Sequence, residues 1–279
     1  MKKLISIFLI TLINLSIFAG SLKDYVCIVE PQIPESTKEF LTEYKDELLQ
    51  KGYKSYASYI EAYLKGSFGS GFIVKDSIGK TYILTNRHVV FEAQTAIVKF
   101  ENYDGSVSEY KDMKILAADE DVDVALIALP DSFKRPALKF STVKLSDGDD
   151  VWSAGFPGLG SEPVWQLGKG IVSNSSARIK ELLDPEISTI IQHSAQVDGG
   201  NSGGPLLLKD SKAAAGYKVV GINTWKAVYR ENTNFAIPSS VLKNFIENSS
   251  SKKNTREVFD DRLALFNKTV NKKMQPSVI

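Results

Sequence analysis

The sequence predicts an all-β fold of many short strands, with helices confined to its two ends. From Gly66 to Pro238, short apolar runs alternate with turns rich in Gly, Asn, Asp and Ser. Apolar residues at helical spacing occur in 34–65 and again after Pro238. Many short strands separated by polar turns are typical of a β-sandwich or barrel. The loop 136–149 divides the strands into two groups, so we expect two β-barrels.

The composition is that of an ordinary globular protein and narrows the choice of partners. The 279 residues are 43% hydrophobic and 24% charged, which is enough for a sizeable core. The 34 basic and 33 acidic residues nearly cancel, so charge gives no case for a nucleic-acid partner. Cys27 is the only cysteine, which excludes an internal disulfide. Because bulky Tyr25 and Val26 precede it, we expect a buried structural thiol rather than a lipid-attachment site.

Residues 1–20 have the pattern of an export signal. Two lysines precede the apolar run 4–18, and Ala19-Gly20 supplies small residues for cleavage. The run is shorter than the roughly 20 apolar residues that a membrane span needs. We expect a cleaved signal peptide, with an uncleaved anchor as the alternative. The mature protein is then periplasmic or secreted, with no stable membrane insertion.

Residues 21–66 are predicted to form an N-terminal helical extension. One apolar stripe is spaced for a first helix that ends near Gly52, and a second stripe follows it. The two stripes are Phe40, Leu41, Tyr44 and Leu48, then Tyr56, Tyr59, Ile60, Tyr63 and Leu64. We favour a helical hairpin packed on the back of a barrel over a regulatory or substrate-gating extension.

Residues 67–248 are predicted to form the main domain, two β-barrels split near 136–149. The expected strands are 69–74, 81–85, 95–100, 107–115, 122–129, 150–155, 164–173, 188–193, 205–208, 217–224 and 233–237. A closing helix is expected in 239–248, because its apolar residues recur at helical spacing. Residues 249–279 read as a polar linker and a C-terminal amphipathic helix, which docks on the domain or on another subunit.

The segment 199–204 carries the strongest chemical signal in the chain. Within it, Ser202 lies between two pairs of glycines. Glycines allow backbone conformations with positive φ, and such a loop can direct successive N–H groups at one point, as acyl transfer requires. We interpret Ser202 as a nucleophile. The alternative is a glycine-rich turn with a solvated serine.

A serine nucleophile needs a base, and the base needs an orienting carboxylate. The chain has two histidines, and His88 follows a β-rich run that ends at Thr85. Downstream, Asp119, Asp121 and Asp123 precede an apolar run. The order His, Asp, Ser is one of three known orders for this chemistry. The three signals together therefore indicate a nucleophilic hydrolase.

Five segments of the sequence resemble those of the trypsin-like serine peptidases of the bacterial Deg/HtrA type. They are residues 69–74 (GSGFIV), 84–90 (LTNRHVV), 123–129 (DVALIAL), 200–206 (GNSGGPL) and 235–238 (FAIP), in family order. The resemblance implies a chymotrypsin-like double β-barrel with its active site in the cleft between the halves. Relatives usually carry PDZ domains after the peptidase domain. This chain ends too soon for one, so we do not expect substrate delivery by a PDZ domain.

The resemblance also implies roles for individual residues. His88 is the expected general base, Asp123 its orienting carboxylate and Ser202 the nucleophile. The amides of Gly200 and Ser202 are the expected oxyanion hole. Asp123 is preferred because it directly abuts the apolar run, with Asp121 as the runner-up. The other histidine, His193, is interpreted as a structural strand residue rather than a second base.

The expected function is an exported serine endopeptidase that works through an acyl-enzyme, with protein quality control as one role. Its expected partners are peptides or unfolded proteins, and oligomerisation stays open. The alternatives are a catalytically inactive binding or chaperone module, and another hydrolase such as an esterase. No Cys/His cluster, close carboxylate pair or phosphate-binding glycine loop is evident, so no metal or cofactor is expected.

Two departures from the family pattern affect activation. Asn201 replaces the aspartate with which digestive relatives bind a newly cut N-terminus, and no Ile-Val-Gly-Gly start exists. We therefore expect activity without zymogen cleavage. Asp198-Gly199 stands where relatives commonly have Asn-Pro. The loop is then freer, so a collapsed oxyanion hole at rest remains an alternative.

The resemblance also places a substrate pocket. Its expected lining is Gln196, Ile222, Asn223, Thr224, Asn234 and Phe235. No acid occupies the pocket-floor position near Gln196, so a preference for Lys or Arg is not expected. We expect small or medium uncharged side chains to be preferred.

Overall fold

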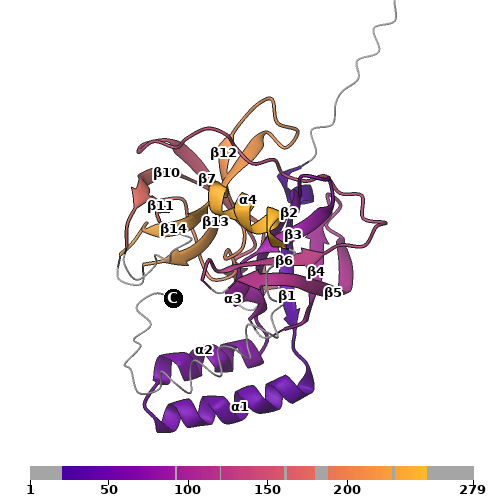
Figure 1. The fold of residues 1–279 in the computed structure, drawn as a ribbon, viewed down its shortest axis with the longest axis vertical. Coiled ribbons are helices and arrows are strands. Elements are labelled where there is room, and N and C mark those ends of the chain that lie inside the picture. Colours follow the sequence, from indigo (N-terminus) through magenta and orange to yellow (C-terminus); the bar gives the residue numbers. More distant parts are fainter. Residues whose placement is uncertain are drawn as a thin grey trace, which may run out of the picture.

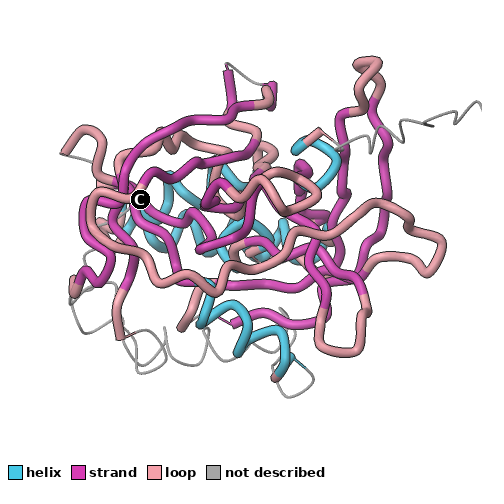
Figure 2. Tube along the Cα trace, turned by 90° about the horizontal axis from the view of Figure 1, so that it is seen from above, coloured by secondary structure: helices cyan, strands magenta, loops and turns pink. Residues whose placement is uncertain are grey.

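The structure is two closed antiparallel β-barrels of six strands each, lying side by side (Figure 1). This computed structural model describes residues 21–91, 93–119, 121–159, 162–179, 188–227 and 230–249. The predicted signal segment and nearly all of the predicted C-terminal segment lie outside these residues. Seen from above, strands outweigh helices in the described chain, and loops connect them (Figure 2). None of the described helices is both long and apolar enough to cross a membrane.

The first barrel closes in the order β1-β2-β3-β6-β5-β4. Its strands are β1 (Val26–Gln32), β2 (Gly69–Lys75), β3 (Thr81–Thr85), β4 (Thr95–Glu101), β5 (Val107–Asp119) and β6 (Val124–Ala128). Successive side chains of a strand point to opposite faces, and in β4 every second residue is accordingly buried. The inward residues, among them Ile73, Ile83 and Phe100, form a core of this barrel.

Residues 21–66 are not helical throughout, which corrects the sequence-based prediction. Leu22–Tyr25 is a short 3-10 helix (η1), and β1 then closes the first barrel by pairing with both β2 and β4. The first four residues of β1 are all buried. A short apolar run that is buried on both faces lacks the alternation by which strands are recognised, so the strand was missed.

A helical hairpin is inserted between β1 and β2, as the apolar stripes predict. It consists of α1 (Glu35–Gln50) and α2 (Lys54–Leu64), joined through Gly52 at φ +84°. Its apolar residues pack on Phe91, at the end of the short helix α3 (Arg87–Val90). Figure 1 shows α2 next to α3, with α1 on the far side of α2. The hairpin therefore contacts the body at the helix that carries His88, and not at the back of a barrel.

The second barrel closes in the order β10-β11-β14-β13-β12-β7. Its strands are β7 (Asp150–Gly155), β10 (Gln166–Ala177), β11 (Ile190–His193), β12 (Pro205–Lys209), β13 (Tyr217–Lys226) and β14 (Asn234–Pro238). A two-stranded sheet of β8 (Gly158–Leu159) and β9 (Glu162–Pro163) projects from it. The closing helix α4 (Ser239–Glu247) buries Leu242, Phe245 and Ile246.

The two barrels share one hydrophobic core. A single cluster joins Phe72 and Leu84 of the first barrel to Leu207 and Ile222 of the second, and to α4. The connecting segment 129–149 is also bound to both barrels. Its Leu138 N–H donates to Ile73 of β2, and its Ser141 N–H donates to Val219 of β13. This shared core fixes the position of residues of one barrel relative to those of the other.

Candidate active site

His88 and Asp123 are joined by two hydrogen bonds. The Nδ1 atom of His88 lies 2.8 Å from Oδ2 of Asp123, and the His88 main-chain N–H donates to Oδ1 at 2.9 Å. Nearby, the side-chain amide of Asn86 donates to the main-chain oxygen of Asp123 at 2.9 Å. The carboxylate therefore fixes both the ring and the backbone of the same histidine. The other ring nitrogen, Nε2, is left for a second partner.

Asp123 is buried in a strained backbone conformation at the start of β6. It is 7% exposed and has a φ of 51°, which is uncommon for any residue other than glycine. Thr224 Oγ1, from the second barrel, donates to Oδ2 at 2.5 Å. Burial by itself raises the pKa of Asp123, but the charge of His88 and the hydrogen bonds from His88 and Thr224 outweigh burial and lower that pKa. The carboxylate is therefore ionised at neutral pH.

Ser202 meets this pair through Thr224. The Ser202 hydroxyl donates to the main-chain oxygen of Thr224 at 3.4 Å, a long hydrogen bond. In the described part of the chain, no hydrogen bond joins that hydroxyl to His88. Catalytic hydrogen bonds are often long or unformed without substrate. The structure thus brings the three predicted residues together through one threonine.

The peptide groups before Gly200 and Ser202 have fixed orientations. The oxygen of Gly199 accepts from the Gly158 N–H at 2.9 Å, and the oxygen of Asn201 accepts from the Gly204 N–H at 2.9 Å. No described peptide bond is cis, and in a trans peptide the N–H points away from the C=O. The amides of Gly200 and Ser202 therefore point away from those contacts, and neither binds an acceptor among the described residues.

Ser70 of β2 binds the loop 199–204, which we call the serine loop, to the first barrel. Its N–H donates to the oxygen of Ser202 at 2.8 Å, and its hydroxyl donates to the oxygen of Gly200 at 2.7 Å. The same hydroxyl accepts from the Phe156 N–H at 2.9 Å, and Thr85 donates to the Ser70 oxygen at 2.7 Å. Sequence reasoning placed Ser70 in a strand and missed this role. Its position between two glycines, in a segment that matches the family, was the available signal.

Asn201 fastens the loop on its other side. The side chain is 1% exposed, and its Nδ2 donates to Oε1 of Gln166 on β10 at 2.8 Å. Asn201 stands at the position of the aspartate in digestive relatives, and it forms a neutral hydrogen bond there. Because Asn201 is uncharged, neutral hydrogen bonds rather than an ion pair bind this loop to both barrels among the described residues.

The six predicted pocket residues have four different environments. Ile222 and Phe235 are buried in the core that the barrels share. Asn223 and Asn234 are buried and hold backbone: Asn223 donates to the oxygens of Gly204 and Pro205, and Asn234 to that of Ala195. Gln196 is exposed and donates to Asp198 at 2.8 Å. Thr224, the sixth, is bound to Asp123 instead.

Asp119, a competing candidate for the orienting carboxylate, and His193, a candidate second base, make other contacts. Oδ1 of Asp119 accepts from the amides of Asp121 and Val122, so it shapes the turn that leads to Asp123. His193 is fully buried in β11, and burial lowers its pKa to about 4. Among the described residues, no group of three or more His, Cys, Asp or Glu could hold a metal ion.

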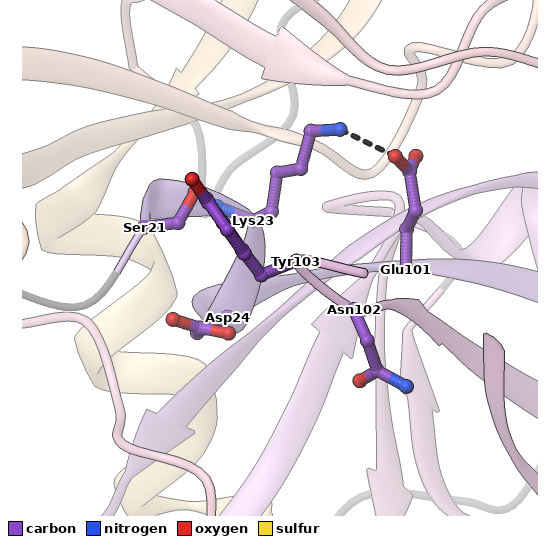
Figure 3. Close-up of a pocket in the computed structure, with 6 residues that line it drawn as sticks. All are labelled: Ser21, Lys23, Asp24, Glu101, Asn102 and Tyr103. Atoms are coloured by element: carbon purple, nitrogen blue, oxygen red, sulfur yellow. Dashed lines mark hydrogen bonds and ion pairs between the residues drawn. The ribbon is translucent and has the colours of Figure 1, made fainter. Parts of the chain in front are cut away.

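A small polar pocket of about 230 Å³ lies at the start of the described chain (Figure 3). It is lined by Ser21, Lys23, Asp24, Glu101, Asn102 and Tyr103. All three of its charged residues are already paired, since Lys23 binds Glu101 and Asp24 lies 3.4 Å from Arg135. None of the residues that contact His88 or Ser202 lines it.

Two antiparallel barrels, with a carboxylate–imidazole pair on one and a serine loop on the other, define the chymotrypsin-like class of fold. The family model described as "Trypsin-like peptidase domain" matches residues 69–222. The chain belongs to this family.

Its relatives are of the HtrA type. "Serine protease Do-like HtrA" of Bacillus subtilis (strain 168) is 34% identical over 189 residues, which cover 66% of this chain and 39% of that protein. "Serine protease HTRA1" of Xenopus laevis is 36% identical over 189 residues, which cover 67% and 37%. A serine endoprotease structure from Yersinia pestis aligns with a TM-score of 0.54 at 25% identity, over 82% of this chain and 64% of that one. The chain thus spans less than half the length of these two curated relatives.

Proposed function

We propose that this protein is a serine endopeptidase that cleaves peptide bonds through an acyl-enzyme. Ser202 is the nucleophile, His88 the general base and Asp123 its orienting carboxylate. One observation carries the proposal: Asp123 binds the ring of His88 at 2.8 Å while Thr224 connects Asp123 to Ser202. Family membership and the named relatives support the same activity.

The first half of the reaction forms the acyl-enzyme. Nε2 of His88 takes the proton of the Ser202 hydroxyl as Oγ attacks the scissile carbonyl carbon. Asp123 stabilises the imidazolium that forms. The C–N bond then breaks, and His88 gives its proton to the leaving amine. In the second half, His88 takes a proton from water, the hydroxide attacks the ester, and Ser202 recovers its proton.

The amides of Gly200 and Ser202 stabilise the negative oxygen of each tetrahedral intermediate. Their orientation is set beforehand, because Gly158 and Gly204 hold the adjoining carbonyls. Donors that need no reorganisation are worth about 3 kcal/mol each in related chemistry. This arrangement supports a preformed oxyanion hole over a collapsed one, in spite of Asp198-Gly199.

The activity can be measured with an unfolded protein as substrate. Ser202→Ala and His88→Ala should each lower turnover by roughly 10⁶-fold, because the three residues act as a unit. Equal thermal midpoints would show that the variants are folded. Turnover by Ser202→Ala at the rate of the unchanged protein would exclude the mechanism.

A catalytically inactive binding module is the second candidate. It is favoured by the Ser202 hydroxyl, which is directed at the Thr224 oxygen. An inactive module would bind unfolded protein and leave it intact, with no effect of Ser202→Ala. Faster turnover of esters than of peptides would instead indicate the esterase alternative.

The proposal also includes export, a role in protein quality control and a preference for certain side chains at the cleavage site. We expect the protein outside the cytoplasm, cleaved after Ala19 or Gly20, which fractionation and N-terminal sequencing would test. We expect small or medium uncharged side chains at the cleavage site, because no acid occupies the expected pocket-floor position near Gln196. A peptide library cut mainly after Lys or Arg would contradict this.

A further inference from the structure

The α1–α2 hairpin touches the body of the protein at the helix that carries His88. That helix, α3, has four residues and is followed by Phe91 in an unusual conformation, with φ 35° and ψ −101°. The last carbonyls of any helix lack partners within it. In so short a helix, the carbonyl of the candidate base is among them.

Two tyrosines of α2 bind these carbonyls. The hydroxyl of Tyr59 donates to the main-chain oxygen of His88 at 3.0 Å, and that of Tyr63 donates to the oxygen of Val90 at 2.7 Å. Residues four apart lie on one face of a helix, so a single face of α2 supplies both donors. The hairpin thereby holds the main chain of His88 itself.

The same two rings hold the turn that leaves α3. Tyr59 and Tyr63 meet the ring of Phe91 edge-on, with centroids 5.4 and 5.0 Å apart. Such contacts contribute beyond the area that they bury. A backbone with positive φ at a phenylalanine persists only where its surroundings impose it. Here α2 supplies part of those surroundings.

We propose that the hairpin is a positioning element for the catalytic base, acting through Tyr59 and Tyr63. This inference rests on the proposed function, since it gives His88 a catalytic role. Asp123 holds His88 by its ring and N–H, whereas α2 holds it by its C=O. With both in place, the ring is fixed relative to Ser202; without the tyrosine hydroxyls, α3 can shift although the His88–Asp123 pair survives.

The test compares three tyrosines of α2. Tyr59→Phe and Tyr63→Phe each remove a hydroxyl and keep the ring that contacts Phe91. Tyr56→Phe is the matched control, because the hydroxyl of Tyr56 binds none of the described residues. We expect kcat to fall about fivefold in each test variant, the loss of one ordinary hydrogen bond, with KM unchanged. Tyr56→Phe should leave both constants unchanged.

The outcomes separate this inference from the proposed function. All measurements are made well below each thermal midpoint, so that a purely structural loss would leave kcat unchanged. If the unchanged protein turns over and Tyr59→Phe matches Tyr56→Phe, the hairpin has no positioning role. If the unchanged protein is inert, the proposed function fails, and the downfield proton resonance of the His88–Asp123 hydrogen bond decides the inference. Tyr59→Phe should broaden or shift that resonance, whereas an unaltered resonance would overturn the positioning role.

Discussion

Thr224 serves two residues of the candidate site with two different groups. Its hydroxyl donates to Asp123 at 2.5 Å, and its main-chain oxygen accepts from Ser202 at 3.4 Å. Sequence reasoning assigned Thr224 to the substrate pocket. The hydrogen bond from its hydroxyl to Asp123 joins the two barrels, and such a contact leaves no periodic pattern in the sequence. Ser70 was missed for the same reason.

Thr224→Val should lower kcat/KM by about tenfold at neutral pH and by more in acid. A hydrogen bond to a charged group contributes on the order of 2 kcal/mol. Burial raises the pKa of Asp123 and the Thr224 hydrogen bond lowers it. Without that hydrogen bond, the pKa of Asp123 therefore rises towards its ordinary value. As the pH falls, the Asp123 carboxylate is then protonated at a higher pH than in the unchanged protein. Thr224→Ser keeps a hydroxyl and should retain most activity; superimposable pH profiles for the Val and Ser variants would contradict this role.

We expect His193 to make the second barrel sensitive to acid. It is fully buried, and a backbone hydrogen bond at Ala195 only partly offsets the effect of burial on its pKa. Burial lowers its pKa from 6.5 to about 4. Between these values the unfolded chain binds a proton that the folded protein does not, so the free energy of unfolding falls as pH falls.

His193→Leu should remove this acid sensitivity. Relative to the variant, the unchanged protein should lose about 1.4 kcal/mol of unfolding free energy per pH unit below 6.5. The total by pH 4 is on the order of 3 kcal/mol. Urea titrations of both proteins at a series of pH values measure the difference. Parallel curves would show that His193 does not control acid stability.

At the scale of elements, the serine loop is defined by its contacts with both barrels. Ser70 binds it from β2, and Gln166 binds it from β10. Its glycines are required where the loop approaches other backbone. At Gly203, φ is +84° and an added Cβ would lie 2.1 Å from the Ser70 oxygen. No rearrangement of a flexible side chain can relieve that contact.

Gly203→Ala should therefore abolish turnover and lower the thermal midpoint. Gly148→Ala is the matched control, since Gly148 also has positive φ (+91°) but nothing within 4 Å of an added Cβ. The control has only the conformational cost of a side chain at positive φ, roughly 1–2 kcal/mol. Circular dichroism melts and peptide turnover compare the two. Equal losses would mean that the close approach to Ser70 is unimportant.

Most elements follow from local sequence pattern, and the exceptions have a physical cause. The barrel strands from β2 to β14 were predicted wherever turn residues bound an apolar run, as at Thr81–Thr85 and Pro205–Lys209, whereas the two-residue strands β8 and β9 were not predicted. β1 was missed because Val26–Val29 is buried on both faces and does not alternate. The hairpin was predicted, but its contact with α3 was not, because docking depends on tertiary geometry.

At the scale of the whole molecule, the shared core brings the two halves of the site together. His88 and Asp123 lie on the first barrel, and Ser202 and Thr224 on the second. The double barrel was predicted from the loop 136–149 that separates two groups of strands and from the family resemblance, and the comparisons confirm this fold. The three catalytic assignments stay predictions, since spacing in the sequence identifies residue types but not the direction of a hydroxyl. Asn201 and Gln166 hold the loop without an ion pair to a new terminus, so we expect an active chain as soon as it folds.

Intact-protein mass spectrometry after fluorophosphonate treatment tests the central claim most directly. The account predicts a single adduct on Ser202 of the folded chain, without prior proteolytic cleavage, and its loss in Ser202→Ala. Labelling should also become far slower in His88→Ala, because the hydroxyl then lacks its base. A protein that forms no adduct, or that labels equally fast without His88, would contradict the account.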